Sequence, residues 1–109
     1  MFEVFYLEGE IQREMASPER LKELVEKGTR LWIDLIDSTN AEISFLGDIF
    51  DLHPVTVEDL SDEGTRVKIE VFDNYNFIVL YNLFMDTRIN KYEYDVVIGN
   101  NYIITKDVR

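Results

Sequence analysis

Acidic side chains and a single histidine gather in the middle of this 109-residue chain, and they are the groups best suited to chemistry. Residues 31 to 65 carry nine acids and no Lys or Arg. Either solvent screening or a bound cation has to relieve so much uncompensated negative charge. Hard divalent cations such as Mg²⁺ prefer carboxylate oxygens, so the adjacent Glu58 and Asp59 are the candidate metal ligands. The nine acids are Asp34, Asp37, Glu42, Asp48, Asp51, Glu58, Asp59, Asp62 and Glu63.

These acids do not form a complete metal-binding motif. They lack the alternating ligands and central glycine of an EF-hand loop, so the fold or a second subunit has to assemble any site. The alternative interpretation of Glu58 and Asp59 is a solvated helix face, which is the usual place for acidic side chains.

His53 is the only histidine, so one chain cannot form a two-histidine zinc site. Asp51 or Asp48 could support it as a general base, but Pro54 directly after it indicates a helix boundary. No nucleophile motif accompanies it, and no glycine-rich phosphate loop is present. We therefore expect no enzyme.

Composition restricts the remaining classes. The balance of 11 basic against 22 acidic residues gives a net charge of −11, which opposes binding to nucleic acid. The absence of cysteine excludes disulfides and Cys-type zinc, so a cytoplasmic setting is the default. The most apolar run, 77–85, is shorter than the roughly 20 residues of a membrane-spanning helix, and the N-terminus shows no signal peptide.

One domain, 1–109, is expected, and its first half alternates strands with helices. Residues 2–7 and 11–15 predict a hairpin that turns at Gly9-Glu10. Ser17-Pro18 starts a helix that ends near Gly28. Residues 31–35 read as a buried strand. Thr39 and Glu42 have capping-box spacing for a second helix, which Gly47 weakens slightly, and His53-Pro54 starts a third.

The second half is richer in strands. Residues 67–72 and 77–83 predict a strand pair in the middle of the sheet. A second hairpin joins 92–98 to 102–105 through Gly99-Asn100-Asn101, whose residues tolerate positive φ. The fold class is α/β (α+β), with a mixed parallel and antiparallel sheet flanked by helices. The aromatic residues assigned to core and sheet are Tyr75, Phe77, Tyr81, Phe84, Tyr92 and Tyr94.

Several short motifs, read in order, resemble the CorA magnesium transporters. The family pattern runs Trp-Ile-Asp, Phe-x-Leu-His-Pro-Leu-x-x-Glu-Asp, Arg-Pro-Lys-Val-Glu, Tyr-x-Phe-x-Val-Leu and Asn-Phe-Leu-Val-Thr. Each motif is weak alone, and the ordered set is specific. The resemblance covers about residues 31–106, and Val67 departs from it where the family has proline. The matching segments are 31–35, the helix at Thr39, 50–59, 66–70, 75–80 and 101–105.

The resemblance implies the N-terminal cytoplasmic domain of a homopentameric channel for divalent cations, anchored in the membrane by segments absent from this chain. Glu58 and Asp59 match acids that help bind Mg²⁺ between subunits and hold the closed state. Their partner carboxylates come from a long helical segment of the neighbouring subunit, and the Gly-Met-Asn pore signature is also absent. The chain would then supply half of a cation sensor.

Two other interpretations stay open. A zinc transporter of the same family would share this scaffold, and Co²⁺, Ni²⁺ and Zn²⁺ are alternatives to Mg²⁺. A free-standing, soluble acidic binding module would keep the fold without the channel.

Overall fold

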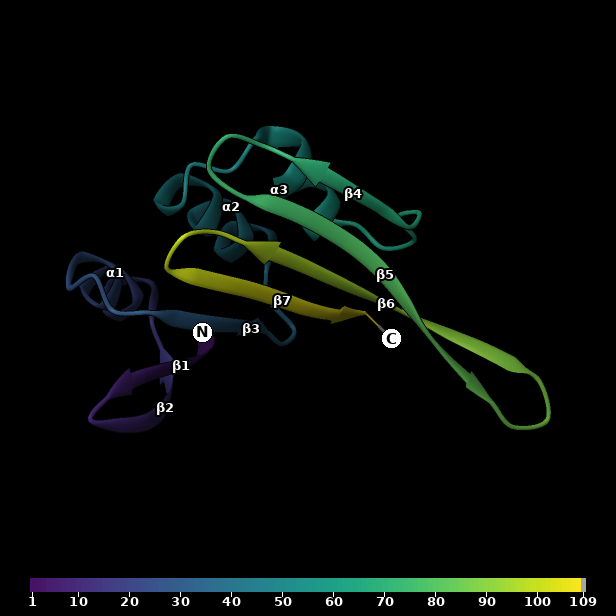
Figure 1. Ribbon diagram of the computed structural model, residues 1–109, viewed down its shortest axis with the longest axis horizontal. Helices are drawn as coiled ribbons and strands as arrows, with labels where there is room; N and C mark the ends of the chain where they lie inside the picture. Colours follow the sequence, from purple (N-terminus) through teal and green to yellow (C-terminus); the bar gives the residue numbers. More distant parts are fainter. Residues whose placement is uncertain (109) are drawn as a thin grey trace.

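A seven-stranded mixed sheet runs through the computed structural model, which describes residues 1–108, and three helices lie on one face of it (Figure 1). The strand order is β2-β1-β3-β7-β6-β5-β4; β3 and β7 are parallel and all other neighbours are antiparallel. The elements are β1 (Phe2–Glu8), β2 (Glu10–Ala16), α1 (Pro18–Glu26), β3 (Leu31–Leu35), α2 (Asn40–Ile49), α3 (Pro54–Ser61), β4 (Lys68–Val71), β5 (Asn76–Met85), β6 (Ile89–Ile98) and β7 (Tyr102–Val108).

All three predicted helix starts are confirmed, each with a side-chain cap. Ser17 Oγ accepts a hydrogen bond from the Arg20 amide at 3.2 Å, ahead of Pro18 in the first turn. Thr39 forms the expected reciprocal capping box with Glu42 at the start of α2. The cap of α3 is His53, described with the site below.

The prediction that residues 67–72 and 77–83 form the middle of the sheet is wrong. Strand β4 is an edge strand, and β7 occupies the central position. The alternation in β4 explains the error, since its apolar residues face away from the helices and its charged residues face them. Ile69 is 71% and Val71 78% exposed, whereas Lys68 and Glu70 are partly buried.

The two hairpins are confirmed. Strands β1 and β2 belong to the main sheet because β1 pairs with both β2 and β3. Gly9 turns the first hairpin with φ of 77°. Gly99 lies in the second hairpin, and its φ is not positive, so backbone freedom is not what requires a glycine there. A Cβ on Gly99 would lie 2.1 Å from the Tyr102 ring, so the close approach of that ring requires glycine.

The core lies between the helices and the sheet. Phe2, Leu21, Leu46 and Phe77 are among its fully buried side chains. Gly47, predicted only to weaken α2, also lets α3 approach, because an added Cβ would lie 2.6 Å from Val57 Cγ2. Within residues 1–108 the longest helix has ten residues, and no helix has the length and hydropathy of a membrane-spanning segment.

Candidate metal site

Helix α3 presents the two predicted ligands in different directions. Glu58 is exposed, whereas Asp59 turns toward the sheet and its side chain is only 20% exposed. Lys68 Nζ of β4 lies 2.5 Å from Asp59 Oδ2 and 3.0 Å from Glu70 Oε1. The hydrogen bond with Asp59 is the main reason why the pKa of Lys68 is raised. Asp59 therefore already has a cation beside it, and this cation belongs to the protein.

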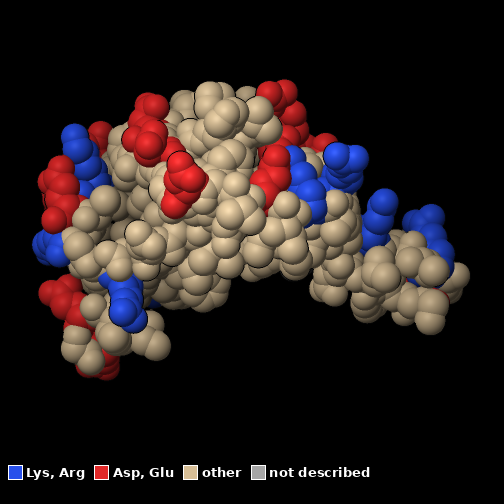
Figure 2. Space-filling view, turned by 45° about the horizontal axis from the view of Figure 1, so that its top comes forward, with Lys and Arg blue, Asp and Glu red and all other residues tan. Residues whose placement is uncertain are grey.

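Solvent screens most of the negative charge of residues 31–65, because most of these acids are exposed. Three of its nine acids are partly buried and have partners. Asp59 has Lys68, Glu42 caps α2, and Asp34 accepts a hydrogen bond from Thr105 Oγ1 at 2.8 Å. The other six are exposed, and Figure 2 shows acidic side chains spread over the body of the molecule. The exposed six are Asp37, Asp48, Asp51, Glu58, Asp62 and Glu63.

His53 has the helix-boundary role that its sequence context indicates. Its Nδ1 accepts a hydrogen bond from the Val55 amide at 3.1 Å, and its ring lies 5.7 Å from the Phe72 ring. The His53 amide donates to the Tyr75 hydroxyl at 2.9 Å. Because these contacts fix the start of α3, His53 positions Glu58 and Asp59 one turn further along the helix.

A second pair of acids, Glu93 and Asp95 on β6, is buried under the end of α3. Glu93 Oε1 accepts hydrogen bonds from the amides of Gly64 at 2.8 Å and Thr65 at 2.9 Å. Asp95 is completely buried and lies opposite Lys106 in the β6–β7 register. Sequence reasoning missed this pair, since acids alternating with Tyr and Val suggest a polar outer face rather than a buried one.

Ionising both carboxyl groups of this pair is costly, because each is buried beside the other. When both carboxyl groups are ionised neither can donate, and Glu93 Oε2 and both Asp95 oxygens then have no hydrogen-bond partner within the described residues. Burial, followed by the hydrogen bond and the charge of Glu93, raises the pKa of Asp95 to about 8. Asp95 is therefore mostly protonated at neutral pH, which removes one of the two buried charges.

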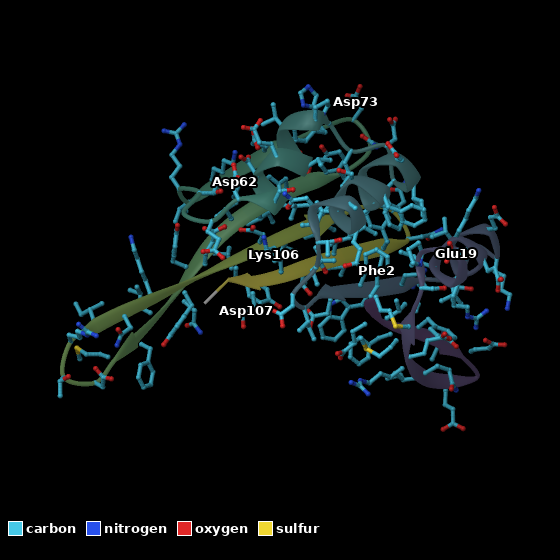
Figure 3. All side chains as sticks on the ribbon, turned by 180° about the vertical axis from the view of Figure 1, so that it is seen from behind. Phe2, Glu19, Asp62, Asp73, Lys106 and Asp107 are labelled. Atoms are coloured by element: carbon cyan, nitrogen blue, oxygen red, sulfur yellow. The ribbon has the colours of Figure 1, made fainter. Side chains whose placement is uncertain are left out.

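A polar hollow of about 710 Å³ opens where the parallel strands β3 and β7 end. Lys106 and Asp107 are successive residues of β7, so they leave the strand on opposite faces (Figure 3). Across residues 1–108, no group of three or more acidic or histidine side chains is arranged to hold a metal ion. The residues around the hollow are Asp34, Leu35, Ile36, Asp37, Ser38, Ser61, Glu63, Lys106 and Asp107.

Comparison with known proteins assigns the family. The sequence profile described as CorA-like Mg²⁺ transporter protein matches residues 27–107, about three quarters of the chain. The chain belongs to this family. The recognition made from the ordered motifs is therefore confirmed, and so is the predicted fold class.

Individual relatives agree with the assignment. The cobalt/magnesium transport protein CorA of Thermotoga maritima is 30% identical over 83 residues, which are 75% of this chain and 23% of that protein. The magnesium transporter ALR2 of Saccharomyces cerevisiae is 31% identical over 61 residues, 56% of this chain and 7% of that protein. The soluble domain of CorA from Methanocaldococcus jannaschii has the same fold, with a TM-score of 0.65 at 16% identity over 97% of this chain and 40% of that one. This CorA-like chain thus spans less than a quarter of these two curated relatives.

Proposed function

We propose that this CorA-like chain is the cytoplasmic regulatory domain of a divalent-cation transporter and that it senses intracellular Mg²⁺. In this proposal Glu58 and Asp59 form one half of a cation site, and acids of a neighbouring subunit in a homopentamer complete it. Cation binding holds the assembly closed, and loss of the cation frees mutual repulsion between the acids and opens the pore.

The ion pair between Asp59 and Lys68 is the observation that carries the proposal. It links α3 to the edge strand β4 through a single lysine that already contacts two carboxylates. A divalent cation attracts the Asp59 carboxylate more strongly than one ammonium group does. Binding therefore exchanges an internal cation for an external one and alters how α3 sits on β4. Glu58, exposed one residue earlier, is free to join the ion from the solvent side.

Magnesium is the first choice of ion because the family profile and the Saccharomyces relative name it, and the Thermotoga relative adds cobalt. Carboxylate ligands suit Mg²⁺ better than they suit Zn²⁺, which prefers nitrogen and sulfur. Zn²⁺ and Ni²⁺ are therefore the competing ions to be titrated beside Mg²⁺ and Co²⁺.

Limited proteolysis during a Mg²⁺ titration tests the site. Because the proposed site needs acids of a neighbouring subunit, the titration uses the assembled transporter. It should gain protection as Mg²⁺ rises, and Asp59→Asn and Glu58→Gln should shift the midpoint to higher Mg²⁺. Asp73→Asn and Glu19→Gln remove exposed acids elsewhere on the chain and should leave the midpoint unchanged (Figure 3). If all four substitutions shift the midpoint equally, the protection by Mg²⁺ depends only on the net charge of the protein and not on Glu58 and Asp59.

Asp59→Asn also leaves Lys68 without its main partner, so a loss of folding could imitate a loss of binding. The double variant Asp59→Asn/Lys68→Gln removes both members of the ion pair and controls for this. Retention of the wild-type midpoint in that folded double variant would exclude Asp59 from the site.

A further inference from the structure

The far ends of β5 and β6 form an arm, residues 80–92, that projects beyond the rest of the sheet (Figure 1). Strand β4 pairs with β5 only at residues 76–79, and β7 pairs with β6 only at 93–98. Within the described chain the arm is thus a two-stranded ribbon with both edges open. Isolated two-stranded ribbons are marginally stable in water, and they gain stability from packing against another surface.

The arm also exposes large apolar side chains. Leu83 is 69%, Met85 76% and Ile89 71% exposed. The alternation of β5 and the register between Met85 and Ile89 place all three on the side that faces the helices further along the sheet. No helix reaches this side of the arm among residues 1–108. Contiguous exposed apolar residues of this kind mark interaction surfaces.

The charge of the arm is opposite to that of the rest of the chain. Arg88 and Lys91 outweigh Asp86, so residues 80–92 carry +1 and the remainder carries −12. Figure 2 shows basic side chains on the projecting arm, whereas the body carries both acidic and basic side chains. The six exposed acids of residues 31–65 offer a complementary surface, and the acids Asp62 and Glu63 directly follow α3.

We propose that the arm docks on a second copy of this chain. Leu83, Met85 and Ile89 lie in the contact. Arg88 and Lys91 face the exposed acids of residues 31–65 on the neighbour. The two complementary surfaces lie on different parts of the molecule, so the contact is head-to-tail, and such contacts form a ring when the rotation between successive copies closes. The inference rests on the proposed homo-oligomer for its second copy, and it identifies the surface that would join the copies. The basic side chains of the docked arm also supply part of the positive charge that relieves residues 31–65 of the neighbour.

A lipid surface fits these observations less well. Apolar and basic residues together can bind anionic membranes, but the −12 charge of the body repels such a surface. Insertion of the arm among acyl chains would also leave its open backbone edges without hydrogen-bond partners.

Sedimentation velocity of the 109-residue chain, measured as a concentration series in EDTA, tests the proposal. The chain should associate reversibly beyond the dimer, and the association should weaken as salt rises. Met85→Ser/Ile89→Ser should abolish it, and Arg88→Glu should lower the association constant about tenfold. Lys22→Glu makes the same charge change at an exposed position of α1 and should alter it less than about twofold.

Four outcomes would overturn the proposal. The wild-type chain could remain monomeric throughout, Arg88→Glu and Lys22→Glu could weaken association equally, or Met85→Ser/Ile89→Ser could associate normally. The fourth is co-sedimentation with phosphatidylglycerol vesicles that the arm substitutions abolish, in a chain that does not self-associate. Circular dichroism confirms that each variant folds. Because EDTA removes divalent ions, a failure here is distinguishable from a failure of the Mg²⁺ proteolysis test.

Discussion

The β5–β6 ribbon has two halves, the part between β4 and β7 and the projecting arm of residues 80–92, and they differ in which side chains they bury and expose. Under α3, this ribbon buries two acids, and Asp95 has no exposed surface. In the arm, the same two strands expose Leu83, Met85 and Ile89. Folded proteins usually place acids outside and large apolar groups inside. Each half departs from this rule, and each departure has a cost that some other feature of the molecule or its assembly has to offset.

The buried half offsets its cost within the chain. Glu93 holds the loop after α3 by accepting hydrogen bonds from two amides, and protonation of Asp95 removes one of the two charges. The arm has no such compensation among the described residues. The buried acids therefore have a structural role within the chain, whereas the exposed apolar side chains of the arm are placed to contact a second copy.

The largest expected effect comes from Glu93→Ala, which leaves the Gly64 and Thr65 amides without their acceptor. We expect it to lower the free energy of unfolding by about 3 kcal/mol, because two part-buried amides lose the charged acceptor to which they donate. Chemical denaturation measures this loss. Glu93→Gln keeps an acceptor oxygen and serves as the control. A loss as small as that of Glu93→Gln would mean that the two amide contacts contribute little.

The next effect depends on pH. The pKa of Asp95 is about 8 in the folded chain and ordinarily 3.8, so the folded state binds the additional proton between these values. The free energy of unfolding therefore falls as pH rises from about 4 to about 8 and then levels off. Asp95→Asn should flatten this fall and make the chain about 2 kcal/mol more stable near pH 9.

Denaturation of wild type, Asp95→Asn and the exposed control Asp73→Asn across this pH range checks the second prediction. The control should follow the wild-type profile. An Asp95→Asn profile that runs parallel to wild type would show that Asp95 does not carry the proton.

The smallest effect on stability belongs to the arm. Met85→Ser/Ile89→Ser should change the free energy of unfolding by less than about 0.5 kcal/mol, because both side chains are exposed in the single chain. The same variant should lose self-association. Denaturation at low protein concentration, set beside sedimentation, separates the two properties. A large loss of stability in the monomer would place these side chains in a core contact and remove the contrast with the buried half.

Local signals in the sequence predicted much of the fold. The strand at 31–35 has the predicted bounds, and Ser17-Pro18, Thr39 and His53-Pro54 start helices as their capping chemistry requires. Strand order was not predictable from these signals. The placement of β7 between β3 and β6 depends on contacts between residues some 70 positions apart, such as Trp32 Nε1 donating to Thr105 Oγ1.

The site was predictable only in part. Adjacent carboxylates after a helix start marked Glu58 and Asp59, but nothing local to them indicated that Lys68, nine residues later, would pair with Asp59. The lysine comes from β4. In this strand the charged residues face the helices and the apolar residues face solvent, which is the reverse of the usual arrangement. The position of Glu93 depends on the loop at Gly64 and Thr65, whose amides donate to it from a segment some 28 residues earlier.

Calorimetric Mg²⁺ titration of Lys68→Gln tests most directly whether the ion replaces Lys68 beside Asp59. The substitution removes the internal competitor, so the Mg²⁺ affinity should rise about threefold to tenfold over wild type. The double variant Asp59→Asn/Lys68→Gln should lose that gain. Two results would contradict the exchange of Lys68 for a divalent cation. One is a Mg²⁺ affinity of Lys68→Gln that equals that of wild type, and the other is a Mg²⁺ affinity of the double variant that equals that of Lys68→Gln.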